Sequence, residues 1–417
     1  MCRGRLHRAG QGDQAGVCRH LAMIHFMFRG WNPPADSPLK EKGTVSPALR
    51  GSRIRRATMS HASRGVHRSR GHRRASRAKL FVLGIAVLAA LGGVAWPVIN
   101  HFNGQSDQSD QVTYGQQASG SGGNGGGAAN PAKTLMPTGP QAHFRVQNRL
   151  PDGTTVGVVT LKGPKSGFTG KVWVWAPKQY SEPKYARSGF PVMVALPGGE
   201  GFPYNYWMGT DLKLQATIAK LSQEGRSLPF LLAMPVLNPN DKNYYDGSDI
   251  PGQPKMGTWL TEDVPNLMKA NFRTLKSRDG WAFMGSSSGG FSGLKAVLKY
   301  PEKFKAVIAS GPDIVPDSPL WAGYGAAEQA NNPERLAQKL IAKKGPDVFL
   351  DFQVGTLERT VMPKVDKFIA QYGHGPVKTR LLKIPGGQHD AKKYVQGMAD
   401  SSLQWISAHM EGPTADG

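Results

Sequence analysis

Three consecutive serines in a glycine-bounded pentad, GSSSG at 285–289, are the residues best suited to nucleophilic chemistry. A short apolar run at 281–284 precedes the pentad and a helix-compatible segment follows it. This is the pattern of a serine held on a tight strand-to-helix turn. Ser287 is the candidate nucleophile, because it alone has glycine at both −2 and +2, and the following N–H, on Ser288, could stabilise an oxyanion. A plain glycine–serine loop is the alternative, since such pentads also arise by chance.

A serine nucleophile needs a histidine as its base, and the chain after residue 140 contains His143, His374, His389 and His409. His389 follows the last predicted strand, 378–384, on a glycine-rich loop. Open α/β sheets place their ligands at this carboxyl end of the strands, so we favour His389. His143 precedes the predicted sheet, His374 lies in a helix–strand connection, and His409 falls in the last predicted helix.

The acid that orients the histidine should follow the preceding strand, predicted at 347–352, and Glu358 has that position. Asp351 lies inside that strand, where a structural role is expected. Asp390 is a poorer candidate because it is adjacent to the histidine, and adjacent residues rarely orient each other.

A second oxyanion donor is expected from the loop PGGEG at 197–201, which ends a predicted strand at 190–196. Glycine lets the backbone approach a substrate carbonyl closely. The N–H of Gly199 or Glu200 would serve, and Gly199 is our candidate, together with Ser288.

The elements that must position these residues alternate along the chain. Strands are predicted at 155–161, 171–176, 190–196, 229–236, 281–284, 306–309, 347–352 and 378–384. Helices are predicted at 212–223, 260–271, 289–299, 333–343, 361–372 and 396–409. This order predicts a mostly parallel sheet with helices on both faces, in which the first two strands form an antiparallel edge.

The N-terminal part has a different composition. Of the 52 Lys and Arg residues, 18 lie in residues 1–79, which contain only 3 of the 29 Asp and Glu residues. We predict a disordered basic tail there, with Met59 as the hypothetical true start and 1–58 as an extension that is not native. A nucleic-acid partner is not favoured, because the tail runs directly into an apolar segment.

That apolar segment, 80–99, has no charged residue and is long enough to cross a bilayer once. The basic cluster at 70–79 predicts a cytoplasmic N-terminus. A cleaved signal peptide is the alternative, because 93–95 has the small-x-small form of a cleavage site. A Gly/Ser-rich linker at 100–140 would join it to a domain at 141–412 that contains no cysteine.

Several segments of that domain resemble the "putative esterase" family of α/β-hydrolases, which includes esterase D-type enzymes and secreted mycolyltransferases. They are KMGTWLTEDVP at 255–265, NYYD at 243–246, the pentad with Gly290, and YPEKFKA at 300–306. The resemblance spans most of 165–410. It implies an α/β-hydrolase fold and serine chemistry, with the nucleophile at Ser287, the histidine at His389 and the acid most nearly at Glu358. Met256, Ser288 and the AKKY segment at 391–394 depart from the family pattern.

We therefore expect an exported, membrane-tethered serine esterase of the bacterial plasma membrane, or a secreted one if the signal is cleaved. Its partners would be an ester substrate, such as a cell-envelope lipid or glycan, and the membrane. Two alternatives stay open: an acyltransferase that uses a sugar or glycerol hydroxyl, and a non-catalytic envelope-binding domain. No cofactor or metal is expected, since the polar loop at 239–249 matches no calcium-binding pattern.

Overall fold

A computed structural model describes residues 111–112, 114 and 132–416 of the chain. The predicted basic tail, the apolar segment at 80–99 and most of the predicted linker lie outside these residues. Within the described part, none of the helices has the length and apolar character needed to cross a bilayer.

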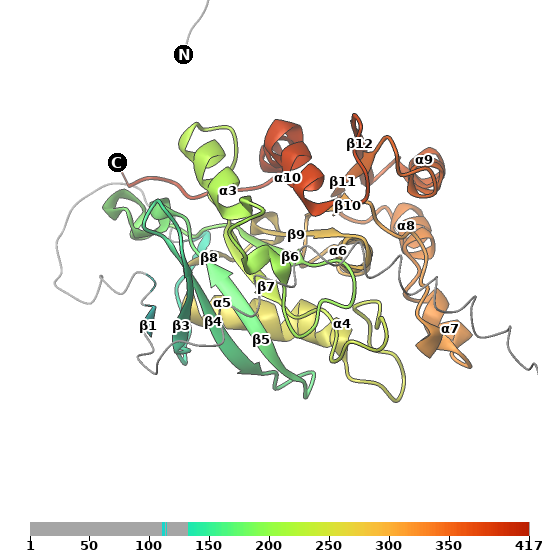
Figure 1. The fold of residues 1–417 in the computed structure, drawn as a ribbon, viewed down its shortest axis with the longest axis horizontal. Helices are drawn as coiled ribbons and strands as arrows, with labels where there is room; N and C mark the ends of the chain where they lie inside the picture. Colours follow the sequence, from blue (N-terminus) through green and yellow to red (C-terminus); the bar gives the residue numbers. More distant parts are fainter. Residues whose placement is uncertain (1–110, 113, 115–131, 417) are drawn as a thin grey trace, which may run out of the picture. The chain divides into compact units, whose positions relative to one another are not determined.

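The domain is built on a ten-stranded sheet with the order β1-β3-β4-β5-β7-β6-β9-β10-β11-β12 (Figure 1). Its antiparallel part contains β1 (Gln111–Val112), β3 (Phe144–Arg149), β4 (Thr155–Lys162) and β5 (Thr169–Trp175). Strand β5 also pairs antiparallel with β7, so the two strands predicted at the edge lie inside the sheet. The antiparallel pairing of these two strands was predicted correctly, but their place at the edge was wrong, because β1 and β3, which the sequence pattern did not indicate, extend the sheet beyond them.

The remaining strands are parallel, as predicted. They are β6 (Val192–Leu196), β7 (Leu231–Pro235), β9 (Trp281–Ser286), β10 (Ala306–Ser310), β11 (Val348–Gly355) and β12 (Val377–Ile384). Every residue of β6, β7, β9 and β10 is buried, because helices cover both faces of this part of the sheet. A separate two-stranded sheet pairs β2 (Thr134–Leu135) with β8 (Thr274–Leu275).

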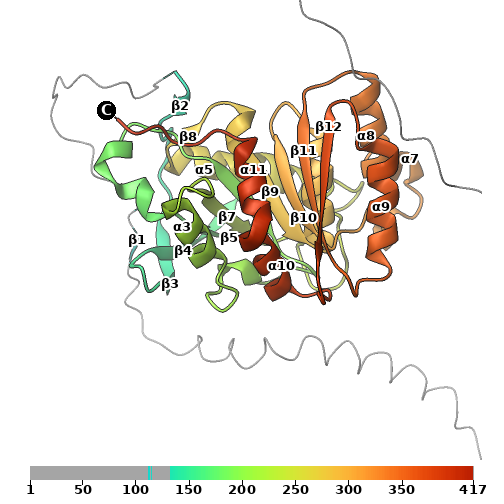
Figure 2. The same cartoon turned by 90° about the horizontal axis from the view of Figure 1, so that it is seen from above.

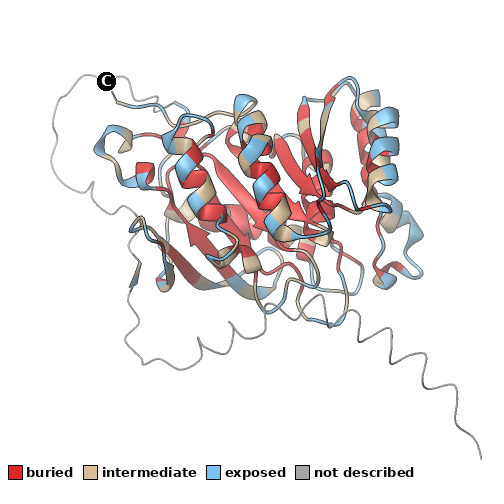
Figure 3. Cartoon of the chain, turned by 45° about the horizontal axis from the view of Figure 1, so that its top comes forward, coloured by how far each residue is buried: buried red, intermediate tan, exposed pale blue. Residues whose placement is uncertain are grey.

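Helices α3, α10 and α11 cover one face of the sheet, and α5 and α6 cover the other (Figures 1 and 2). Helix α8 packs against α6 and α9. The helices are α3 (Leu214–Gln223), α4 (Met256–Thr258), α5 (Val264–Asn271), α6 (Ser288–Lys299), α7 (Gly325–Gln329), α8 (Pro333–Ala342), α9 (Val361–Tyr372), α10 (Ala391–Gly397) and α11 (Leu403–Ala408). Figure 3 shows the buried sheet behind helices whose outer faces are exposed.

Two π-helical segments interrupt the predicted helices. One, η5 (Trp259–Asp263), joins α4 to α5, and the other, η8 (Met398–Ser402), joins α10 to α11. The last predicted helix, 396–409, also begins five residues earlier than expected, at Ala391. Asp390 explains this start, since its side chain accepts hydrogen bonds from the N–H groups of Lys392 and Lys393.

Candidate active site

Ser287 lies where β9 ends and α6 begins, at the strand-to-helix turn that the pentad predicts. Its φ of +53° is a left-handed value that a non-glycine residue adopts only when its surroundings enforce it. The N–H of Ser287 donates to the C=O of Ser310 at the end of β10, 2.9 Å away. A Cβ on Gly289 would stand 2.5 Å from the C=O oxygen of Leu196, so only glycine allows α6 to begin so close to β6.

His389 and Glu358 are brought together by the loops after β12 and β11. His389 Nδ1 lies 2.7 Å from Glu358 Oε1. The carboxylate is buried, whereas 48% of the His389 side chain remains exposed. Burial acts to raise the pKa of Glu358, but hydrogen bonds from His389, the Gly355 N–H and Tyr394 outweigh it and hold that pKa below its ordinary value. Glu358 is therefore an ionised acceptor at neutral pH.

Ser287, His389 and Glu358, hereafter the candidate triad, all border the end of β10. Ser310 accepts the N–H of Ser287, and the next residue is Gly311, with φ +54°. A Cβ on Gly311 would lie 2.7 Å from Glu358 Oε1 and 2.9 Å from His389 Nδ1. One short segment thus accepts the backbone N–H of Ser287 and borders both His389 and Glu358.

The other candidate acids have different partners. Asp351 is fully buried in β11 and forms an ion pair with Arg380 of β12, with 2.7 Å between its Oδ1 and the guanidinium Nε. Asp390 caps α10, as described above. Because both carboxylates have structural partners, Glu358 is the acid whose position fits the imidazole.

The other candidate histidines also lie elsewhere. His143 directly precedes β3 and its Nδ1 is 2.6 Å from the side-chain nitrogen of Gln111. His409 stacks on Phe349, with 4.1 Å between ring centroids. His374 follows α9 and its N–H donates to the C=O of Tyr372.

The loop after β6 contains Gly199, one of the two predicted oxyanion donors. The N–H of Gly198 donates to the hydroxyl of Tyr206, which is also hydrogen-bonded to the hydroxyl of Ser286. The N–H of Gly199 has no partner among the residues that the structure describes, so it can donate to a ligand oxygen. The Ser288 hydroxyl donates to the C=O of Gly199 over 2.7 Å and fastens this loop to the start of α6.

The sequence analysis did not identify Tyr394 of α10. Its hydroxyl donates to Glu358 Oε1 over 2.8 Å and lies 3.0 Å from His389 Nδ1. Tyr394 lies five residues after the histidine, in the segment noted as departing from the family pattern. The signal that could have revealed it is the capping residue Asp390, which places Tyr394 in the first turn of a helix directly behind the histidine loop.

Asp246, Asp313 and Asp317 lie close together, and Asp313 also lies near His389. Burial and the charges of Asp246 and Asp313 raise the pKa of Asp317 to about 6. Burial likewise raises the pKa of Asp313, although the positive charges of Lys364 and His389 oppose this effect. The residues described include no group of three or more His, Cys, Asp or Glu side chains suited to a metal ion.

Lys295 anchors the long polar loop that follows β7 to helix α6. Its buried ammonium donates to the C=O of Gly247 over 2.6 Å, and also to the C=O of Asp246 and the hydroxyl of Ser248. Burial lowers the pKa of Lys295 to about 7. This loop contains Tyr245 and Asp246 of the NYYD segment.

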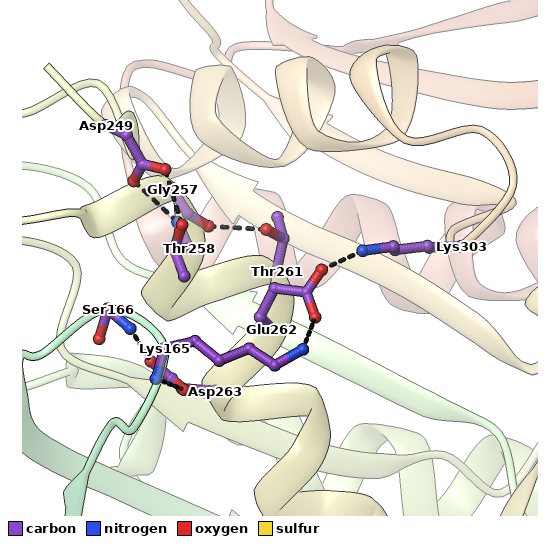
Figure 4. A network of polar contacts seen from close by, with 9 residues as sticks. All are labelled: Lys165, Ser166, Asp249, Gly257, Thr258, Thr261, Glu262, Asp263 and Lys303. Carbon is purple, nitrogen blue, oxygen red and sulfur yellow. Dashed lines mark hydrogen bonds and ion pairs between the residues drawn. The ribbon is translucent and has the colours of Figure 1, made fainter.

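The family-like segment at 255–265 binds the turn between β4 and β5 through hydrogen bonds and an ion pair (Figure 4). Glu262 forms ion pairs with Lys165, over 2.8 Å, and with Lys303. Asp263 accepts two backbone N–H groups of the turn, the first from Lys165 over 3.0 Å. None of these contacts involves the candidate triad, so the segment acts through the fold.

Comparison with known proteins identifies the family. A family profile described as "Putative esterase" matches residues 170–405, which is more than half of the chain. The chain therefore belongs to this esterase family, as its sequence motifs indicated, and it has an α/β-hydrolase fold.

Solved structures agree on the fold. A ferulic acid esterase is 18% identical with a TM-score of 0.51, and the match covers 62% of this chain and 99% of that enzyme. An S-formylglutathione hydrolase from Agrobacterium tumefaciens is 19% identical with a TM-score of 0.51, covering 64% and 99%.

Among curated proteins, an uncharacterized protein of Corynebacterium glutamicum is 25% identical over 238 residues. The match covers 52% of this chain and 54% of that protein, so the chain spans about half the length of this relative.

Proposed function

We propose that this protein is a serine esterase that hydrolyses carboxylic esters through an acyl-enzyme. The observation that carries the proposal is the 2.7 Å contact between His389 Nδ1 and Glu358 Oε1. An imidazole that donates from Nδ1 to a carboxylate keeps Nε2 unprotonated and able to accept the proton of a serine hydroxyl. The left-handed backbone of Ser287, at the start of α6, supports its assignment as the nucleophile.

In the proposed reaction, Ser287 Oγ forms a bond to the ester carbonyl carbon while its proton passes to His389 Nε2. The carbonyl electron pair moves to oxygen, which the N–H groups of Gly199 and Ser288 stabilise. Collapse of this oxyanion breaks the bond to the alcohol, which leaves with the proton from His389. Water then attacks the acyl-enzyme by the same steps, giving the carboxylic acid and free Ser287. Glu358 stabilises the imidazolium throughout.

Burst kinetics with a p-nitrophenyl ester test this proposal. We expect a burst of p-nitrophenol equal to the enzyme concentration, and a loss of at least about 10⁴-fold in kcat for Ser287→Ala. A fluorophosphonate probe should label the wild type on the peptide that contains Ser287. Unchanged turnover in the variant would refute the nucleophile. Absence of both turnover and labelling in the wild type would favour the non-catalytic binding domain.

Acyl transfer is the second candidate, and the exposure of His389 favours it. With 48% of that side chain exposed, an alcohol as well as water can reach the base. If a sugar or glycerol takes the acyl group, adding it should increase p-nitrophenol release after the burst and give an acylated acceptor. Mass spectrometry of the products separates the two activities.

We further propose that the enzyme is exported and held at the plasma membrane by residues 80–99, with an envelope lipid or glycan as its ester substrate. The uncharged length of this segment and the basic cluster at 70–79 support the proposal. Fractionation of cells, followed by N-terminal sequencing, distinguishes a retained anchor from a cleaved signal. Recovery of the chain in the cytosolic fraction would refute both.

A further inference from the structure

Tyr394 is a buried residue in contact with both members of the acid–base pair. Its side chain is 1% exposed, and its ring lies at right angles to that of His389, with centroids 5.9 Å apart. Burial, followed by the charge of Glu358, raises the pKa of Tyr394 far above its ordinary value, so the hydroxyl keeps its proton. An ionised carboxylate only accepts, so this hydroxyl donates to Glu358 Oε1.

The two oxygens of Glu358 therefore receive three donors. Oε2 accepts the N–H of Gly355 over 2.6 Å. Oε1 accepts both the Tyr394 hydroxyl and, in the tautomer needed for catalysis, Nδ1–H of His389. Two donors on one oxygen compete for its negative charge, so the phenol weakens the interaction between that oxygen and a protonated imidazole.

We propose that Tyr394 is a positioning residue that sets the pH range of the reaction, by donating to the same carboxylate oxygen that holds His389. The inference rests on the proposed serine esterase function. The hydroxyl fixes the carboxylate in place and withdraws part of its charge. As a result, we expect the reaction to keep its rate to a lower pH than it would with Glu358 alone.

The substitution Tyr394→Phe removes only the hydroxyl and tests this inference. We expect the acid-side midpoint of the kcat/KM profile to move up by about half to one pH unit. We also expect kcat on the plateau to fall about three- to tenfold with KM changed less than twofold, since Tyr394 contacts the acid–base pair. Tyr372→Phe is the matched control, because no hydrogen bond of its hydroxyl is recorded among the residues described, and its profile should not move.

A Glu358→Gln background tests whether the effect of Tyr394 on the pH midpoint of kcat/KM depends on the charge of the Glu358 carboxylate. There, Tyr394→Phe should no longer shift the midpoint, because the amide has no charge to share. A stronger donor should act in the opposite direction, so 3-fluorotyrosine at position 394 should move the midpoint down. This isosteric change also keeps the test available if Tyr394→Phe fails to fold. An unchanged midpoint in both variants would reduce Tyr394 to a packing residue and overturn the inference.

A second readout needs no turnover. The ring resonance of His389, assigned by its loss in His389→Gln, can be titrated by NMR in the wild type and in Tyr394→Phe. A shift in this titration without any ester hydrolysis would keep the effect of Tyr394 on the imidazole and reject the proposed function. Ester hydrolysis with identical titrations and identical pH profiles would do the reverse.

Discussion

The hydroxyl of Ser288 is a single contact on which the proposed oxyanion site depends. It donates to the C=O of Gly199 and so fixes the peptide that follows the proposed donor. Full loss of one oxyanion donor costs about 3 kcal/mol of transition-state stabilisation, and a loosened donor loses part of that. We expect Ser288→Ala to lower kcat about tenfold with KM changed less than twofold, as measured with a p-nitrophenyl ester.

The matched control is Ser292→Ala in the same helix. Its hydroxyl is buried and donates to the C=O of Ser288 over 2.8 Å, within α6. Both variants should lower the free energy of unfolding by about 1 kcal/mol, but only Ser288→Ala should slow the reaction. Equal kcat values in the two variants would show that the hydroxyl has no part in holding the loop.

The positions of site residues in the fold were predictable where the local sequence determines them. The pentad placed Ser287 on its turn, and positions just after two strands indicated that His389 and Glu358 meet. Tyr394 and Gly311 were harder to predict. The capping residue Asp390 indicates a helix that contains Tyr394, but the contacts of Tyr394 and Gly311 are with residues on other loops, which the local sequence does not show.

At the scale of elements, the turn after β10 is the feature that assembles the site. Gly311 has φ +54°, and a Cβ there would collide with the Tyr394 hydroxyl and crowd the carboxylate of Glu358. We expect Gly311→Ala to lower kcat/KM at least about 100-fold and the free energy of unfolding by about 1–3 kcal/mol. Steady-state kinetics and urea unfolding measure the two effects.

Gly225→Ala separates strain from collision. Gly225 has φ +70°, but a Cβ on it would meet no atom within 4 Å. This variant should lose about 1 kcal/mol of stability and keep full activity. If Gly311→Ala lost no more activity than this control, the turn after β10 would not be what shapes the acid–base pair.

The elements themselves were predicted well where the apolar pattern was continuous. The buried strands β6, β9 and β10 and the helix α9 appear at or within two residues of their predicted positions. The strands β1, β2 and β8, of two residues each, have too few residues to show a periodic pattern. Likewise, β3 was missed because most of its side chains are polar and only partly buried.

At the scale of the whole domain, Lys295 links stability to pH. The ordinary pKa of lysine, 10.5, applies to the unfolded chain, whereas burial lowers it to about 7 in the folded protein. Between these values the unfolded chain binds a proton that the folded protein has released, so stability rises with pH. Below pH 7 both states hold the proton and the effect is constant.

We expect the difference in unfolding free energy between the wild type and Lys295→Met to change in favour of the wild type from pH 7 to pH 10. Urea unfolding at several pH values measures it. Lys220→Met is the control, because that side chain is 74% exposed and its removal should leave the pH dependence unchanged. Parallel curves for the wild type and Lys295→Met would contradict the assignment of the titration to this ammonium.

Residues 310–311, which border Ser287, His389 and Glu358, also indicate where this chain could be recombined with a relative. The backbone up to Gly311 borders the candidate triad, whereas the chain from 312 to 324 forms the next loop region, which contains Asp313 and Trp321. We expect a chimera joined after Gly311 to exchange the loop beside the candidate triad and keep the triad. A junction one residue earlier would separate Ser310 from Gly311, the two residues that border it.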